Sequence, residues 1–268
     1  MHPRSTVTLN TGREMPVLGL GSWELTRDTA GTVLHALDLG YRMIDTAVDY
    51  GSQPGIGDGL ARTDIPRGEL FLVAKVEEDD DAYDATRRYL DEMRQDYADL
   101  VLIHRPPPAG VGTELWEGLV RARDDGFVRD IGISNYTSRQ TEELIEAVGE
   151  VPVVNQIEWT PFGWSQDMLD YCQRRGIVIQ AYSPLTRAER LDDDRLQQVA
   201  GRYDVTPAQV LLRWALQKGT PPLPKANRRD HLEENLGAFR FQLLDEDMAR
   251  LDGLNEEWSA LGGSLQYL

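Results

Sequence analysis

The sequence predicts an α/β fold of the (β/α)₈ (TIM) barrel class, with a β-hairpin across one end. Short apolar runs recur along the chain, and segments with apolar residues spaced about 3.6 apart separate them. Parallel strands need helical crossovers, and eight strand–helix units in about 250 residues are enough to close a sheet on itself. The expected strands are residues 17–20, 41–46, 70–76, 98–104, 128–134, 152–158, 176–183 and 221–225.

The segments between these strands predict helices. Thr137 or Ser138 stands before an acidic first turn, and Thr206 precedes Pro207, a residue that fits the first turn of a helix. Both patterns are typical of helix starts. Helices are expected at 28–38, 83–94, 137–147, 165–174 and 206–217, among others.

The residues before the first barrel strand predict a small hairpin. The stretch "VTLNTGREMPVLGL" turns at Asn10, Thr11 and Gly12. We expect this hairpin to plug the bottom of the barrel, at its amino-terminal mouth. The alternative fold is a doubly wound sheet, but "GLGSW" at 19–23 lacks the third glycine of the G-x-G-x-x-G turn that such a sheet usually carries.

The composition limits which classes of protein this chain can belong to. The 268 residues are 41% hydrophobic and are expected to form one domain, 1–268. A net charge of −17 argues against nucleic-acid binding, which needs a basic surface. Cys172 is the only cysteine, so neither a disulfide nor a cysteine cluster for a metal is expected. No apolar run is long enough to span a membrane and the first residues lack an apolar leader, so we expect a cytoplasmic protein.

Polar residues stand where the predicted strands end. Because the parallel strands of a barrel direct their carboxyl ends to one mouth, these side chains should face the same cavity. A carboxylate, an amine, an imidazole and a phenol that meet there make a device for transferring protons. The residues are Asp45, Lys75, His104, Ser134, Asn135, Gln156, Tyr182 and Lys225.

Seven blocks of the sequence resemble the aldo-keto reductases, in the same order and over essentially the whole chain. They are "DTAVDYG", "VAKV", "VLIHRPP", "IGISNY", "NQIEWTP", "AYSPL" and "LPKANRRDHLEENL". As a whole, the sequence most resembles the compact bacterial-type members of this family, such as the 2,5-diketo-D-gluconate reductases. The resemblance implies a monomer that reduces aldehydes or ketones with NADPH. It points to small polar aldehydes, α-dicarbonyls or keto-sugars as substrates.

The resemblance also implies roles for particular residues. Asp45, Tyr50, Lys75 and His104 would form a catalytic tetrad, in which Tyr50 gives the proton and Lys75 lowers the pKa of that phenol from about 10. His104 would donate a hydrogen bond to the substrate oxygen. NADPH would bind in extended form without a Rossmann fold, and the residues expected to hold it are Gly21, Ser22, Ser134, Asn135, Gln156, Tyr182, Ser183, Leu185, Lys225, Ala226, Asn227, Arg228, His231, Glu234 and Asn235.

The chain departs from the family in the segment expected to hold the adenosine 2′-phosphate. Ala226 stands where serine is usual, and His231 stands where an arginine commonly packs on the adenine. The loss of a hydroxyl and a guanidinium weakens phosphate recognition, although Arg228 and Arg229 could compensate. We therefore expect NADPH to bind with an unusually small preference over NADH.

The expected substrate pocket departs from the family as well. Trp23, Asp49, Glu77 and Arg105 should form its wall, and the last two stand where the family often carries tryptophan. Such a pocket would be polar. The alternative is that Glu77 opens a solvated acidic loop and that Arg105 turns outward.

Two other functions compete with carbonyl reduction. A metal-dependent hydrolase on the same barrel would need several histidine and carboxylate ligands at strand ends, and the chain has 4 histidines, two of them in the N-terminus or a helix, so no metal site is expected. The second rival is a non-enzymatic, reductase-like subunit that binds nicotinamide as a regulator. The complete tetrad argues against it.

Overall fold

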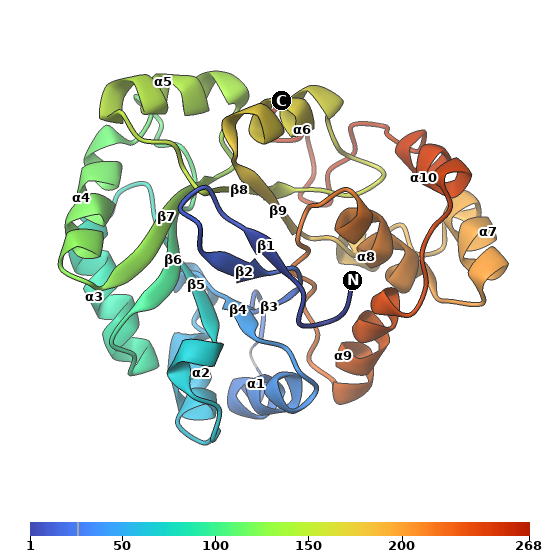
Figure 1. The fold of residues 1–268 in the computed structure, drawn as a ribbon, viewed down its shortest axis with the longest axis horizontal. Coiled ribbons are helices and arrows are strands. Elements are labelled where there is room, and N and C mark those ends of the chain that lie inside the picture. Colours follow the sequence, from blue (N-terminus) through green and yellow to red (C-terminus); the bar gives the residue numbers. More distant parts are fainter. Residues whose placement is uncertain (26) are drawn as a thin grey trace.

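The computed structural model describes residues 1–25 and 27–268, and it confirms the predicted α/β barrel. Its main sheet is parallel, and the strands follow one another in chain order (Figure 1). They are β3 (Gly19–Gly21), β4 (Met43–Asp45), β5 (Phe71–Val76), β6 (Ala98–Ile103), β7 (Val128–Ser134), β8 (Val154–Glu158) and β9 (Val178–Tyr182). A doubly wound sheet would reverse its strand order at one point, and this sheet does not.

The predicted eighth strand, residues 221–225, closes the barrel without forming a regular strand. Prolines occupy three of its five positions, and proline has no backbone N–H to donate to a neighbouring strand. Gly19 and Gly21 on β3 instead donate hydrogen bonds of 3.1 Å to two of its proline carbonyls, and Leu223 donates one of 2.9 Å to β9. We call this line of few hydrogen bonds, between β9 and β3 through residues 221–225, the barrel seam.

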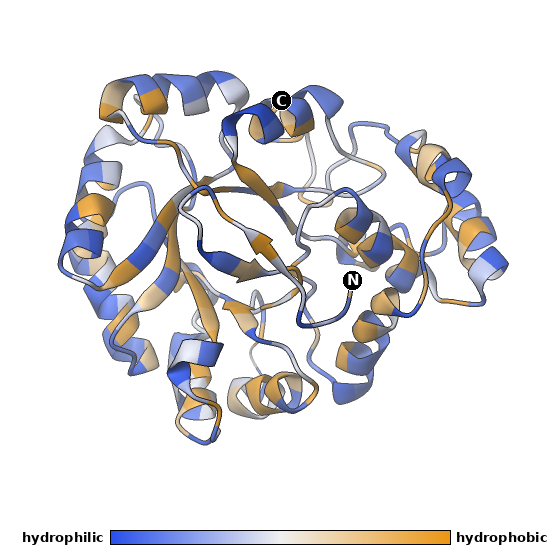
Figure 2. Ribbon diagram, viewed as in Figure 1, coloured by the Kyte–Doolittle hydropathy of each residue, from blue (hydrophilic) through white to orange (hydrophobic). Residues whose placement is uncertain are grey.

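Helices surround the sheet (Figure 1). The five predicted helices are confirmed, with their ends shifted by about one residue. Figure 2 shows that the strands are mostly hydrophobic, whereas hydrophilic residues dominate the helices around them. The helices are α1 (Thr29–Asp38), α2 (Gln53–Leu60), α3 (Ala82–Met93), α4 (Thr113–Asp124), α5 (Ser138–Val148), α6 (Gln166–Arg175), α7 (Asp194–Tyr203), α8 (Pro207–Gln217), α9 (Arg229–Leu236) and α10 (Asp245–Asp252). In the described part of the chain, none of them is long and apolar enough to cross a membrane.

Helix α2 lies in a stretch whose glycines do not favour a helix. Close packing explains them. A Cβ atom at Gly57 would lie 2.7 Å from the backbone oxygen of Met93 on α3, and one at Gly59 would lie 3.0 Å from the side chain of Val33 on α1. The glycines therefore let α2 approach both neighbours, and this packing offsets their poor intrinsic helix propensity.

The predicted hairpin plug is confirmed. Strand β1 (Thr6–Thr8) pairs antiparallel with β2 (Glu14–Pro16), and the pair lies across the barrel in Figure 1. Leu9 and Met15 are buried in one apolar cluster with Met43 and Leu100 of the barrel interior. The hairpin thus seals the end of the barrel where the strands begin.

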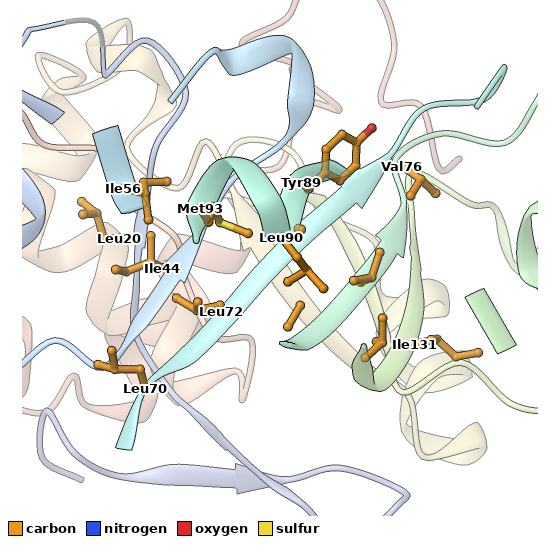
Figure 3. Close-up of a cluster of buried hydrophobic side chains, with 14 of the residues drawn as sticks. Leu20, Ile44, Ile56, Leu70, Leu72, Val76, Tyr89, Leu90, Met93 and Ile131 are labelled. Atoms are coloured by element: carbon orange, nitrogen blue, oxygen red, sulfur yellow. The ribbon is translucent and has the colours of Figure 1, made fainter. Parts of the chain in front are cut away.

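A second apolar layer lies between the sheet and the helices. Figure 3 shows Leu72 of β5 close to Leu90 and Met93 of α3, and Ile131 of β7 farther along the same cluster. All four side chains are at most 4% exposed. Burying a side chain of this size contributes about 1.5–3 kcal/mol, so this layer fixes the strands against the helices and holds the strand ends in place.

Candidate active site

A cavity of about 510 Å³ opens at the carboxyl ends of the strands. It is lined by predicted site residues from all parts of the chain, namely Gly21, Ser22, Trp23, Asp45, Asp49, Tyr50, His104, Arg105, Ser134, Asn135, Gln156, Tyr182, Ser183, Leu185, Lys225, His231, Glu234 and Asn235. The predicted site residues that do not line it are Lys75, Glu77, Ala226, Asn227 and Arg228.

The strands aim their last polar residues inward because side chains alternate along a strand. On β5 the interior residue Val73 is followed two positions later by Lys75, and on β6 Leu102 is followed in the same way by His104. Met43 and Asp45 repeat the pattern on β4. Each polar side chain thus continues a buried apolar row, at the level where the barrel opens.

A buried ion pair lies beneath the cavity. Lys75 is 0% exposed, and its Nζ donates hydrogen bonds to Asp45 Oδ1 at 2.7 Å and to the carbonyl oxygen of Thr46 at 3.2 Å. Burial is the largest single influence and acts to lower the pKa of the Lys75 ammonium, but Asp45 together with Tyr50 and Asp49 outweighs it, so the net pKa is raised. Gln156 Nε2 donates to the other oxygen of Asp45 at 2.8 Å. The ammonium therefore stays charged at neutral pH.

Tyr50 stands above this ion pair. It ends a short 3₁₀ turn (Val48–Tyr50) that follows β4, and Lys75 Nζ lies 5.2 Å from the centre of its ring. Burial raises the pKa of the Tyr50 phenol, and the nearby Lys75 charge lowers it by less. The predicted effect of Lys75 is thus present, but the expected net lowering of the Tyr50 pKa is wrong, because loss of solvation is the larger cause.

His104 forms a hydrogen bond that the sequence did not predict. Its Nδ1 lies 2.7 Å from Glu77 Oε1, and its ring lies edge-on to Tyr50 with centroids 6.1 Å apart. Glu77 is therefore half-buried against His104 rather than part of a solvated loop, whereas Arg105 is exposed yet lines the cavity as predicted. Together, Asp49, Glu77 and His104 place one ligand-type atom each within 4.8 Å of one another. The expectation of no metal site stays a prediction.

Ser134, Asn135 and Tyr182 are hydrogen-bonded to one another and to the backbone around them. Ser134 Oγ donates to the carbonyl of Gln156 at 2.7 Å, Tyr182 donates to Asn135 Oδ1 at 2.8 Å, and Asn135 Nδ2 donates to the carbonyl of His104 at 3.1 Å. Asn135 holds a left-handed backbone conformation with φ 64°. Strain of this kind in a residue other than glycine persists only where its surroundings fix it, and it concentrates at functional sites.

The segment after the barrel seam forms the far end of the cavity. His231, Glu234 and Asn235 line it, but Ala226 is buried in the core. Arg228 is exposed, and its Nε donates to Asp230 at 2.9 Å. Arg228 is also not among the residues that line the cavity. The compensation that the sequence suggested therefore has no support at Arg228.

The chain's last residues supply part of the wall that the sequence did not place. Leu261 and Gln266 line the cavity. Their segment is fastened by Glu158, a buried carboxylate at the end of β8, which accepts hydrogen bonds from Ser259 Oγ at 2.6 Å and from the Ala260 backbone at 2.7 Å. Burial raises the pKa of Glu158. In the sequence, the one sign of this attachment is that Glu158 is an acidic residue at the very end of a predicted barrel strand.

The loop after β9 supplies further lining residues. Arg187 lies with its guanidinium carbon 4.1 Å from the ring centre of Trp23, on the opposite side of the barrel seam. Both residues line the cavity, so this contact bridges its mouth. The lining residues that the sequence analysis missed are Glu24, Pro184, Arg187, Ala188, Leu191, Ala208, Leu223, Leu261 and Gln266.

Comparisons with known proteins agree with this geometry. A model of the Aldo/keto reductase family matches residues 17–256. An aldo-keto reductase of Mycolicibacterium vanbaalenii is 39% identical over 257 residues, which make up 94% of this chain and 92% of that protein. The glyoxal reductase of Bacillus subtilis is 37% identical over 260 residues, 95% of this chain and 94% of that protein.

A solved structure shows the same architecture. The crystal structure of a Bombyx mori aldo-keto reductase in complex with NADP covers 97% of this chain and 95% of its own, with 30% identity and a TM-score of 0.90. Sequence and fold agree over nearly the whole length of both chains. This chain belongs to the aldo-keto reductase family and is an oxidoreductase.

Proposed function

We propose that this protein reduces the carbonyl group of small polar aldehydes, α-dicarbonyls or keto-sugars to an alcohol, with NADPH as reductant and Tyr50 as proton donor. The observation that carries the proposal is the buried Lys75–Asp45 pair placed beneath Tyr50 at the base of one cavity. An ammonium with no solvent contact is costly to bury and is kept for its charge. We further propose a monomeric, cytoplasmic enzyme.

The described residues fit a nicotinamide dinucleotide. The cavity runs from Tyr50 to Asn235, and its 510 Å³ lies in the range of cofactor sites. Asn235 Nδ2 is buried without a hydrogen-bond partner among the residues that the structure describes, so a ligand group would satisfy it. Lys225 and His231 line the same end and suit an anion. A bound NADPH would supply the hydride that goes to the carbonyl carbon.

The chain's own residues handle the proton. Reduction adds one hydride to carbon and one proton to oxygen, and the proton leaves the Tyr50 hydroxyl, which becomes a phenolate. Lys75 stabilises that phenolate from below, while Asp45 and Gln156 hold Lys75 and each other in place. In the reverse direction the phenolate takes the proton from the alcohol.

Two relatives support the cofactor and the reduction of small carbonyl compounds. The Bombyx mori protein was solved with NADP, and the Bacillus subtilis protein is a glyoxal reductase. A panel of carbonyls assayed with NADPH, with Tyr50→Phe as control, tests the proposal. Tight NADPH binding without oxidation by any aldehyde or diketone would favour the non-enzymatic regulatory subunit instead.

The cofactor preference is expected to be small. Because Ala226 is buried and Arg228 is engaged with Asp230, fewer groups than usual are available for the 2′-phosphate. We expect kcat/KM with NADPH to exceed that with NADH by less than about a thousandfold, which corresponds to roughly 4 kcal/mol. Steady-state kinetics with both cofactors and one aldehyde measure this ratio. A larger ratio would contradict the proposed weakness of the phosphate site.

The direction of the Tyr50 pKa sets the pH dependence. Burial raises this pKa above the ordinary value of about 10, so the phenol that reduction requires is present throughout the neutral range. We expect kcat for reduction not to fall through loss of the Tyr50 proton below about pH 10. Alcohol oxidation needs the phenolate, so its rate should rise about tenfold per pH unit between pH 7 and 9. If kcat for carbonyl reduction already fell near pH 7, the pKa of Tyr50 would be lowered and not raised.

A further inference from the structure

The contact between Glu77 and His104 determines more than the position of one ring. The inference below rests on the proposed function, because it concerns the carbonyl substrate. The Nδ1 to Oε1 distance is 2.7 Å, and the exposed fractions of the two side chains are 8% for His104 and 18% for Glu77. Glutamate is ordinarily ionised at neutral pH, and an ionised carboxylate can only accept a hydrogen bond. The proton of this hydrogen bond therefore belongs to His104 Nδ1.

A histidine whose Nδ1 carries the proton has a different Nε2. In neutral imidazole one nitrogen donates and the other accepts, so Nε2 of neutral His104 is an acceptor. His104 lines the cavity, whereas Glu77 does not, so Nε2 is the nitrogen left to meet a substrate. Among the described residues no hydrogen bond engages Nε2. The sequence analysis expected His104 to donate to the substrate oxygen, and the hydrogen bond with Glu77 opposes that role for the neutral ring.

The cavity near the reacting carbon therefore offers one donor and one acceptor. The Tyr50 hydroxyl donates to the carbonyl oxygen, and His104 Nε2 accepts. Asp49, exposed at the same mouth, adds a second acceptor. A carbonyl with a hydroxyl on the neighbouring carbon satisfies this arrangement, because its oxygen accepts and its hydroxyl donates. A dicarbonyl has two acceptors and leaves the Nε2 lone pair facing another lone pair.

We infer that Glu77 acts as a specificity-determining positioning residue, which holds the proton of His104 on Nδ1 and so favours α-hydroxycarbonyls over α-dicarbonyls. The choice narrows the proposed substrate class to compounds such as hydroxyketones and sugars. Glu77 does not touch the reacting atoms. It acts through His104, whose free nitrogen it turns into a hydrogen-bond acceptor.

Acetoin and diacetyl form a matched pair of probes. They share one carbon skeleton, and acetoin carries a hydroxyl where diacetyl carries its second carbonyl. The ratio of their kcat/KM values with NADPH is measured for the wild type and for Glu77→Gln, so that the intrinsic reactivities of the two compounds cancel when the ratios are compared. An ionised carboxylate only accepts, whereas a glutamine can also donate its amide N–H to Nδ1, so Glu77→Gln no longer holds the proton on Nδ1 and lets it move to Nε2.

We expect Glu77→Gln to lower the acetoin-to-diacetyl ratio about tenfold, the effect of one lost hydrogen bond. Glu78→Gln, which removes the same charge one residue away, should leave the ratio unchanged. A ratio for Glu77→Gln within about twofold of the wild type, with activity retained, overturns the inference and leaves the proposed function standing. Failure of the wild type to oxidise NADPH with any carbonyl overturns both.

A second measurement does not depend on activity. Nitrogen-15 NMR of the labelled protein distinguishes the two imidazole tautomers, and the signal that His104→Asn removes identifies the ring. We expect the Nδ1-protonated form in the wild type and a clearly larger share of the Nε2-protonated form in Glu77→Gln. An Nε2-protonated wild type would overturn the inference even if the Glu77 variant failed to fold.

Discussion

Replacement of Tyr50 by phenylalanine is expected to lower kcat for carbonyl reduction about 10²–10⁴-fold, the usual contribution of a positioned acid. The hydroxyl is the group above Lys75 that can give the proton, and phenylalanine keeps the ring that packs edge-on to His104. The ring and its neighbours remain, so the Kd for NADPH should stay within about twofold of the wild-type value.

Stopped-flow or steady-state rates give kcat, and quenching of protein fluorescence by NADPH gives the Kd. Gln53→Ala is a useful comparison, because Gln53 is buried three residues away and outside the cavity lining. A Tyr50→Phe enzyme that keeps more than about a tenth of its activity would show that another group supplies the proton.

Replacement of Lys75 by methionine is expected to have the largest effect on stability. It would leave the Asp45 carboxylate buried with Gln156 as its remaining side-chain partner, and the loss of one member of a buried ion pair typically costs about 3–5 kcal/mol. Urea denaturation measures the free energy of unfolding. The rate of alcohol oxidation at pH 8 should fall as well, because loss of the Lys75 charge raises the pKa of Tyr50 further.

The double variant Lys75→Met/Asp45→Leu separates the two effects. It removes both charges, so it should recover most of the stability lost in Lys75→Met, whereas its activity should remain low. Recovery of activity along with stability would show that Lys75 serves folding alone.

The inward rows explain why three of the four expected catalytic residues could be placed at the mouth of the barrel from the sequence, whereas the position of Tyr50 rested on the family resemblance. Asp45, Lys75 and His104 each stand two residues after a buried apolar residue of the same strand, so a period of two places them at the mouth of the barrel. The same period says nothing about residues 221–225, because prolines remove the hydrogen bonds that define a strand. The strand count was predicted, but the irregular form of its last member was not.

Contacts between loops could not be predicted from the sequence. Glu77 meets His104 only because the ends of β5 and β6 are neighbours and both side chains adopt the required rotamers. The tail reaches the cavity because Glu158 and Ser259, far apart in sequence, meet. Likewise, packing against α1 and α3 decides that α2 is a helix. Each of these features depends on long-range partners that no local pattern specifies.

The barrel seam couples ligand binding to the stability of the fold. Gly21 and Lys225 face each other across it, and both line the cavity. A dinucleotide that touches both edges binds only the closed cylinder, so binding and closure form one equilibrium, and saturation with ligand stabilises the fold by RT ln(1 + [L]/Kd). A bound dinucleotide that contacts both edges would have to leave before the barrel could open along this line, so its binding would oppose opening of the barrel at the seam.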